Sequence, residues 1–237
     1  MGRATTIAWT KSTLNLAWGC TKVTRECTNC YMYRLSEQFG KDPYTVNITK
    51  AGSSPHNMEL AIKKMNSPMF VNSMSDTFHY GIPDAVLDEW FRTFKQHPEK
   101  QFQILTKRPE RAREYFTTRK VPGNCWIGTS VGIRDAKPRI DILREIHAPI
   151  LFLSCEPVLE DLGELNLYDI DWVIIGGESD KNHPRPMKPE WAESVVSQAR
   201  NWGCAVFFKQ MGGKGGDGAG GDLLNGVQIK EFPNGIS

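Results

Sequence analysis

Residues 19–31 have the sequence GCTKVTRECTNCY, which holds three of the six cysteines in the spacing C-x6-C-x2-C. The other three cysteines stand singly, within or beside apolar runs. Two thiolates separated by two residues can converge on one soft metal, and a third thiolate one loop upstream suits either zinc or an iron–sulfur cluster. The spacing therefore indicates a metal site formed by Cys20, Cys27 and Cys30.

The choice of metal depends on a fourth ligand. A structural zinc site is closed by four protein ligands, usually with a second Cys or His pair, and the sequence has no such pair. Three thiolates on a [4Fe-4S] cluster would leave one iron open to a small molecule. We therefore favour the cluster. Two alternatives stay open, which are zinc completed by a distant His or Cys, and a cysteine-rich loop without metal.

Short apolar or β-branched runs alternate with segments of helical character. The predicted strands are 15–18, 69–72, 101–106, 125–129, 150–154, 172–175 and 205–209. The predicted helices are 31–39, 57–64, 84–96, 109–117, 136–146 and 189–202. This alternation indicates βαβ units and a parallel sheet. About six to seven parallel strands predict an α/β fold of the partial, TIM-like (β/α) barrel type rather than a closed eightfold barrel.

Length and composition favour one domain. The 237 residues, 40% of them hydrophobic, are enough for one sizeable core. We predict a barrel over residues 1–211, a glycine-rich flexible loop over 212–221 and a segment over 222–237 that packs back on the barrel. No run approaches the roughly 18 apolar residues of a membrane span. Unpaired cysteines without regular disulfide spacing favour the cytoplasm.

Polar residues follow nearly every predicted strand. The carboxyl ends of parallel strands gather on one rim of a barrel, where active sites are built, although strand ends are often simply solvated. The residues that we select from this rim are Asn72, Ser73, Ser75, Asp76, Thr106, Lys107, Ser130, Glu156 and Glu178. Glu156 and Glu178 end hydrophobic strands, so each needs a partner such as a lysine, a ribose or a ligand ammonium. Asp76 has a plain alternative as a helix cap.

Several motifs in one order resemble the phage Gp37/Gp68-like (DUF5131) family of radical-SAM-like proteins, from about residue 7 to 233. The residues that carry this resemblance are Thr10, Asn15, 19–23, 27–31, 70–76, 105–109, 154–157, 176–179 and 207–210. The six-residue first gap is longer than the C-x3-C-x2-C of radical SAM enzymes at large, and Asn29 stands where those enzymes have an aromatic residue. The nearer relatives share the longer gap.

The resemblance implies a barrel of the radical SAM type with a [4Fe-4S] cluster and S-adenosylmethionine as cofactors. Cleavage of S-adenosylmethionine would give a 5′-deoxyadenosyl radical. The cofactor-binding residues would be Asn72, Ser73, Ser75, Asp76, Thr106, Lys107, Ser130 and Glu156. The catalytic residues would be Lys107, Glu156 and Glu178.

The resemblance also implies a substrate, a glycine-linked thymine in phage DNA that is isomerised during hypermodification. An external electron donor of the flavodoxin or ferredoxin type would be a partner. The net charge of +2 gives no strong attraction to DNA, but rim cations are available for phosphates, namely Lys107, Arg108, Lys181, Arg185, Lys188, Lys209 and Lys214. Two alternatives are repair of a DNA photoproduct by radical SAM chemistry and a non-catalytic metal-binding protein that works through a partner.

Overall fold

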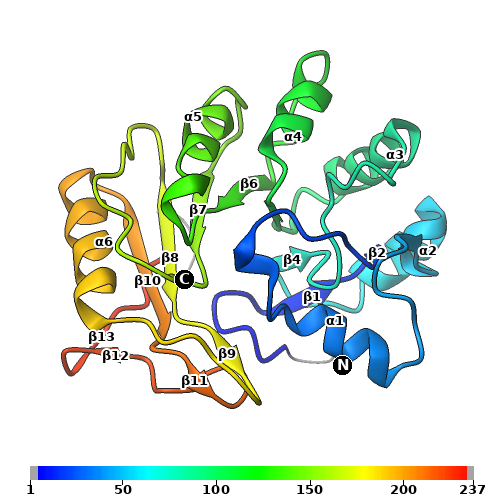
Figure 1. Cartoon of the computed structure of the whole chain (residues 1–237). Helices are drawn as coiled ribbons and strands as arrows, with labels where there is room; N and C mark the ends of the chain where they lie inside the picture. The colour runs from blue at the N-terminus through cyan, green and yellow to red at the C-terminus, as the bar shows by residue number, and fades with distance from the viewer. Residues whose placement is uncertain (1–4, 234–237) are drawn as a thin grey trace.

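The computed structural model describes residues 5–233, and its centre is a seven-stranded, wholly parallel sheet that curves into a half-barrel (Figure 1). The strand order is β1-β4-β5-β6-β7-β8-β10. The strands are β1 (Ser12–Leu14), β4 (Met69–Val71), β5 (Phe102–Thr106), β6 (Cys125–Ser130), β7 (Leu151–Cys155), β8 (Trp172–Gly176) and β10 (Ala205–Gln210). The predicted α/β class and parallel half-barrel are therefore confirmed.

Five helices cover the convex face of the sheet in an arc, and a sixth follows the cysteine loop (Figure 1). The five are α2 (Pro55–Ile62), α3 (Asp84–Lys95), α4 (Pro109–Phe116), α5 (Pro138–Arg144) and α6 (Pro189–Asn201), and the sixth is α1 (Tyr31–Gln38). Four of the five begin on a proline, whose fixed φ suits the first turn of a helix. The predicted helices therefore all exist, within a few residues of their predicted ends.

Alternation along each strand divides the buried side chains between two layers. Val173 and Ile175 of β8 face the helices, whereas Trp172 and Ile174 belong to a separate aromatic cluster on the concave face. That cluster is completed by Trp9, Phe70, Trp126, Phe152 and Phe207. The concave face is therefore closed by aromatic rings along the first part of the strands, and any cavity must lie nearer their carboxyl ends.

Both ends of the described chain pack against this aromatic cluster. The Trp9 ring lies 4.6 Å from that of Phe70, and the Phe232 ring lies 5.3 Å from that of Trp172. The backbone of residues 229–231 bonds to β10, with Phe208 N donating to Ile229 O at 2.8 Å. These contacts involve residues 229–232 of the segment predicted to pack back on the barrel. Residues 1–4 and 234–237 of the predicted parts lie outside the described residues.

The first strand of the sheet was predicted at residues 15–18, which is three residues too far along the chain, and that prediction is wrong. The strand of the main sheet is β1, and the chain then leaves the sheet to form β2 (Ala17–Trp18), which pairs antiparallel with β3 (Asn47–Ile48). The cause is the Asn72 side chain, whose Oδ1 accepts bonds from Leu16 N and Ala17 N at 2.7 and 2.9 Å. Those amides are therefore unavailable to a neighbouring strand.

The glycine-rich loop is more ordered than predicted. Gly213–Lys214 forms a short strand, β11, that pairs parallel with β9 (Ser179–Asp180), so the prediction of a loop without strands is wrong for these two residues. Further bonds close the loop on itself, with Met211 N donating to Gly221 O and Gly212 N to Ala219 O, each at 2.9 Å. Glycines at positive φ make such tight reversals possible.

Within residues 5–233, no helix combines the length and the apolar character that a membrane crossing requires.

Candidate functional site

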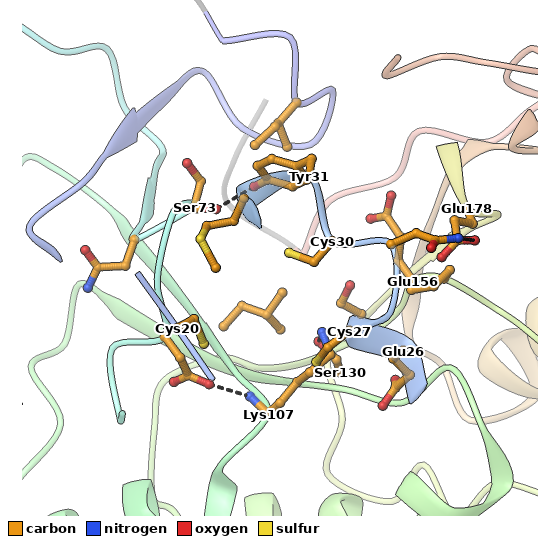
Figure 2. Close-up of a pocket in the computed structure, with 18 of the residues that line it drawn as sticks. Cys20, Glu26, Cys27, Cys30, Tyr31, Ser73, Lys107, Ser130, Glu156 and Glu178 are labelled. Carbon is orange, nitrogen blue, oxygen red and sulfur yellow. Dashed lines mark hydrogen bonds between the residues drawn. The ribbon is translucent and has the colours of Figure 1, made fainter. Parts of the chain in front are cut away.

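A cavity of about 230 Å³ opens at the carboxyl ends of the strands, above the aromatic cluster (Figure 2). This volume lies just below the range of about 300–1,000 Å³ that is usual for small-molecule pockets. Its wall includes every residue predicted for the site, namely Cys20, Cys27, Cys30, Asn72, Ser73, Ser75, Asp76, Thr106, Lys107, Ser130, Glu156 and Glu178.

The strand alternation explains why these residues meet. On β6, Trp126 points into the concave face. Ser130, four residues later, lies on the same face of the strand and lines the cavity. The same spacing of two or four links Phe152 to Glu156, and Phe207 to Lys209. Each concave-facing row therefore changes from aromatic to polar where the strand ends, which places the polar groups around one space.

The cysteine loop leaves β2 and crosses the open side of the half-barrel to the start of α1. It contains a 3-10 turn over Arg25–Cys27, and Cys30 is the residue that precedes the first turn of α1. Figure 2 shows Cys20, Cys27 and Cys30 around the same cavity. All six cysteines of the chain are free thiols.

Glu26 anchors the middle of the loop. Its carboxylate is buried and accepts bonds from Gly132 N at 2.7 Å and from Arg139 Nη1 at 2.9 Å. The Arg139 guanidinium is also buried, and it donates to Ser130 O at 2.8 Å. A buried charge is tolerated only when paired and hydrogen-bonded, and both ions meet that condition. Glu26 therefore fixes the loop to the end of β6.

Asn29 anchors the loop on the other side of the cavity. Its Nδ2 donates to Glu178 Oε2 at 2.8 Å, and Glu178 is also held by Arg185 through Nε at 2.9 Å and through Nη2. Burial alone would raise the pKa of Glu178, but the bonds from Arg185 and Asn29 outweigh it and lower the pKa. Glu178 is therefore a carboxylate that joins the end of β8 to the cysteine loop.

Arg108 holds the first cysteine. Its Nη1 lies 3.0 Å from Asp76 Oδ2 and 3.7 Å from Cys20 Sγ, and its Nη2 donates to Thr21 O at 2.9 Å. The Asp76–Arg108 pair is almost entirely buried, with exposed side-chain fractions of 8% and 7%. This pair therefore connects the loops after β4 and β5 to Cys20.

The electrostatic surroundings of the thiols are mixed. Burial, aided by Asp76, raises the pKa of Cys20 to about 11 against the opposing effect of Arg108. Burial also raises the pKa of Cys30, with Lys107 among the groups that oppose it. Burial would lower the pKa of Lys107, yet the Glu26 carboxylate and the sulfurs of Cys27 and Cys30 raise it. Lys107 is therefore a cation beside two of the thiols, and its Nζ donates to Ser130 Oγ at 3.1 Å.

The sequence model of a family described as "Protein of unknown function (DUF5131)" matches residues 4–233. The chain belongs to this family. The predicted DUF5131 relationship is thereby confirmed, whereas the description names no activity and leaves the radical SAM link a prediction. The comparison with curated proteins and the comparison with solved structures gave no match.

Several residues that we predicted to bind a cofactor in this DUF5131 chain have their polar atoms engaged internally. Asn72 uses its Oδ1 on Leu16 and Ala17 and its Nδ2 on Thr77. Asp76 accepts bonds from Thr106 Oγ1, Lys107 N, Phe78 N and Arg108 Nη1. Its carboxylate is saturated by the protein, so a ligand ammonium would have to displace one of these donors. The helix-cap alternative for Asp76 is wrong, because α3 begins eight residues later.

Ser73 and Ser75 join the loop after β4 to the segment of chain that leads to Cys20. Ser73 Oγ donates to Asn15 Oδ1 at 3.1 Å, and Ser75 Oγ donates to Gly19 O at 2.6 Å. Each hydroxyl keeps acceptor capacity toward the cavity that it lines. These serines therefore hold the loop before Cys20 in place and still offer acceptors to a ligand.

Glu156 has the lysine partner that its position demanded. Its Oε1 lies 2.6 Å from Lys209 Nζ, and that ammonium lies 3.0 Å from Asp217 Oδ1 of the glycine-rich loop. Burial would lower the pKa of Lys209, but Glu156 and Asp217 raise it, so the group is an ammonium ion. The glycine-rich loop thus reaches into the cavity wall.

Four polar residues that shape the site were not predicted for it from the sequence, namely Glu26, Asn29, Arg139 and Asp217. Glu26 and Asn29 lie inside the cysteine motif but are not among its metal ligands. Their place in the motif was a signal from which an anchoring role could have been predicted. Arg139 and Asp217 gave no signal, because each lies on a predicted helix or loop whose direction only the fold determines.

The rim cations named for DNA have different environments. Lys107, Arg108 and Lys209 point into the cavity, and Arg185 is paired with Glu178. The cations on the exposed surface are Lys181, Lys188 and Lys214. The number of rim cations free to follow a phosphate backbone is therefore smaller than predicted.

Proposed function

We propose that this DUF5131 protein is a radical SAM enzyme that uses a [4Fe-4S] cluster held by Cys20, Cys27 and Cys30. The observation that supports this most is that three free thiols and the polar ends of six parallel strands line one small cavity. Active sites of β/α barrels lie at this rim. The half-barrel is compatible with the radical SAM type of barrel that the sequence motifs imply.

The donor set fits such a cluster. Three thiols face one cavity that contains two cations, Lys107 and Arg108, and thiolates bound to iron benefit from nearby positive charge. Among the described residues, no three His, Cys, Asp or Glu side chains converge closely enough to enclose a single ion. The fit therefore rests on donor chemistry and a shared cavity.

When bound, a [4Fe-4S] cluster supplies the electron for reductive cleavage of S-adenosylmethionine to a 5′-deoxyadenosyl radical. The chain positions and shields this chemistry. Arg108 fixes Cys20 through its sulfur contact, and Glu26 and Asn29 fix the segment that bears Cys27 and Cys30.

The residues left to receive S-adenosylmethionine are those with polar capacity toward the cavity. Ser73, Ser75 and Ser130 offer hydroxyl acceptors, and Lys107 offers a cation for a carboxylate. Phe70 and Leu105 form an apolar floor that limits access of water to a radical. Asn72, Thr106 and Asp76 act behind this layer, by holding the loops.

As substrate we propose a glycine-linked thymine in DNA, which is isomerised after loss of a hydrogen from the appended group. The base must leave the helix, since a cavity of about 230 Å³ cannot admit a duplex. With a net charge of +2, binding to DNA is expected to be modest and sensitive to salt. A flavodoxin- or ferredoxin-type protein would deliver the electron. The cytoplasm would supply this donor and the DNA.

The test uses anaerobically reconstituted protein, dithionite, S-adenosylmethionine and DNA that carries glycine-linked thymine. The DNA is digested to nucleosides and examined by liquid chromatography and mass spectrometry. We expect 5′-deoxyadenosine and a nucleoside isomer of unchanged mass and altered retention. A parallel reaction on ultraviolet-irradiated DNA tests the alternative: reversal of a thymine photoproduct there, with no isomer from glycine-linked thymine, would favour the repair enzyme. Absence of 5′-deoxyadenosine with every substrate would favour the non-catalytic metal-binding protein.

A further inference from the structure

Lys209, Glu156 and Asp217 form a mixed-charge cluster in the cavity wall on the side of β8 and β10. The Lys209 side chain is 8% exposed, Glu156 19% and Asp217 33%. Glu156 and Lys209 reach one another across β8 because Gly176 lies between them, and a Cβ at that residue would be 3.3 Å from the Glu156 carboxyl group. The sheet itself is thus built to bring these two side chains together.

The charges of the cluster divide into a fixed pair and an added carboxylate. Glu156 and Lys209 both extend from strand ends, so their charges cancel within the rigid part of the fold. Asp217 adds one further negative charge from a loop, and its other oxygen accepts a bond from Thr6 Oγ1 at 2.8 Å. The second acceptor for the buried Lys209 ammonium is therefore supplied by the glycine-rich loop and not by a strand of the sheet.

The loop that carries Asp217 can move at low cost. Seven of the ten residues in 212–221 are glycine. The loop is held to the barrel by the short β11–β9 pairing, by a bond from Gly218 N to Gln210 Oε1, and by the bonds that Asp217 accepts from Thr6 and Lys209. No apolar side chain of residues 212–221 is among the buried ones. Segments with few buried apolar contacts open most readily. Displacement of Asp217 therefore requires the loss of its bonds from Thr6 and Lys209, but it exposes little apolar surface.

We propose that Lys209 is a binding site for a ligand carboxylate, and that Asp217 occupies this site as an internal substitute until the ligand displaces it and the loop re-forms over the ligand. Exchange of one carboxylate for another leaves the buried charge unchanged. A ligand ammonium would face the Lys209 cation, and a phosphate would add a further negative charge beside Glu156. The geometry thus favours a carboxylate over either.

This inference rests on the proposed function, since the carboxylate that we expect at Lys209 is that of the amino-acid group on the modified thymine. The carboxylate of S-adenosylmethionine is the other source of the same chemistry. The test is isothermal titration calorimetry of the anaerobically purified protein, which needs neither reduction nor turnover. The titrants are glycine-linked thymidine, its methyl ester, S-adenosylmethionine and the methyl ester of S-adenosylmethionine.

We expect wild-type protein to bind the glycine-linked nucleoside more tightly than its ester. Asp217→Asn should tighten binding of the acid by about tenfold and leave the ester unchanged, because the ligand no longer competes with an internal charge-assisted bond. Lys209→Met should remove the preference for the acid, and Lys209→Met combined with Glu156→Gln should do so without leaving Glu156 as an unpaired carboxylate. Asp222→Asn, which pairs with Lys230 outside the cavity wall, is the matched control and should change nothing.

A preference for acid over ester that appears only with S-adenosylmethionine would support the carboxylate site and assign it to the cofactor. Unchanged or weaker binding of both acids in Asp217→Asn would overturn the proposal. If carboxylate-dependent binding is seen but no 5′-deoxyadenosine forms, the proposed function fails and this inference stands. If the isomer forms and Asp217→Asn has no effect on binding, only this inference fails.

Discussion

Two buried charges, Glu26 and Arg108, fix the cysteine loop at the scale of single residues. Each is hydrogen-bonded within the protein, Glu26 to Arg139 and Gly132, and Arg108 to Asp76 and Thr21. Removal of one member of a buried pair leaves the other without a counter-charge in a medium that solvates it poorly. Residues that do not bind the metal therefore decide where the cysteines lie.

The Glu26 anchor predicts a large loss of stability in Glu26→Ala. Because Arg139 would be left buried and unpaired, we expect the free energy of unfolding of the metal-free protein to fall by about 3–5 kcal/mol. Urea denaturation followed by circular dichroism measures it. The matched control is Glu145→Ala, which breaks an exposed pair with Arg113 and should cost less than about 1 kcal/mol. Equal losses in the two variants would contradict the anchor.

Buried thiols away from the loop predict a loss of stability at alkaline pH. Burial raises the pKa of Cys155 to about 12 and that of Cys204 to about 11, from an ordinary 9.0. The folded state thus holds these protons more tightly, so their contribution is complete below pH 9.0 and is lost as pH rises toward 11 and 12. Stability measured against pH should decline less steeply above pH 9.0 in a Cys155→Ala, Cys204→Ala double variant. Identical slopes would show that these thiols are not the cause.

At the scale of elements, the strands and helices were predictable because their signals are local. Apolar runs bounded by polar ends predicted six of the seven sheet strands. The gathering of the carboxyl ends of parallel strands then placed Ser130, Glu156 and Lys107 on one rim. The first strand was misplaced because Ser12 and Thr13 of β1 are not apolar, and because a side chain from a distant loop, Asn72, draws Leu16 and Ala17 away from the sheet.

The partners of the site residues were not predictable in the same way. An ion pair such as Glu26–Arg139 joins residues 113 apart in sequence, and the two side chains lie on separate elements. Nothing in either local sequence specifies the other. The sequence therefore indicated which groups surround the cavity but not that Asp76 and Asn72 are saturated by the protein itself.

The crossing of the β8 end and the glycine-rich loop predicts that Gly177→Ala is destabilising. A Cβ at this residue would overlap the Met211 carbonyl oxygen, so one backbone must shift. We expect the free energy of unfolding to fall by about 1–3 kcal/mol, the usual cost of overpacking. Gly216→Ala is the control, because a Cβ there meets nothing within 4 Å. Thermal unfolding of the two variants compares them, and an undisturbed Gly177→Ala would argue against the close approach.

On the scale of the whole molecule, the fold is a half-barrel. Aromatic rings fill its concave face along the first part of the strands, and a cavity lies at their carboxyl ends. The cysteine loop lies across the open side, and its anchors come from β6, β8 and the loop after β5. Loops that follow strands near both edges of the sheet thus contribute to one cavity. The central claim is that this arrangement holds an iron–sulfur cluster through three cysteines.

The most direct test of that claim is the iron and sulfide content of anaerobically reconstituted protein, read together with its visible spectrum. We predict a brown protein with broad absorbance near about 400 nm, and loss of iron, sulfide and colour in each of Cys20→Ala, Cys27→Ala and Cys30→Ala. Cys125→Ala and Cys204→Ala should retain all three. A colourless protein that contains zinc, or equal loss of iron on replacing a fourth cysteine, would contradict the account.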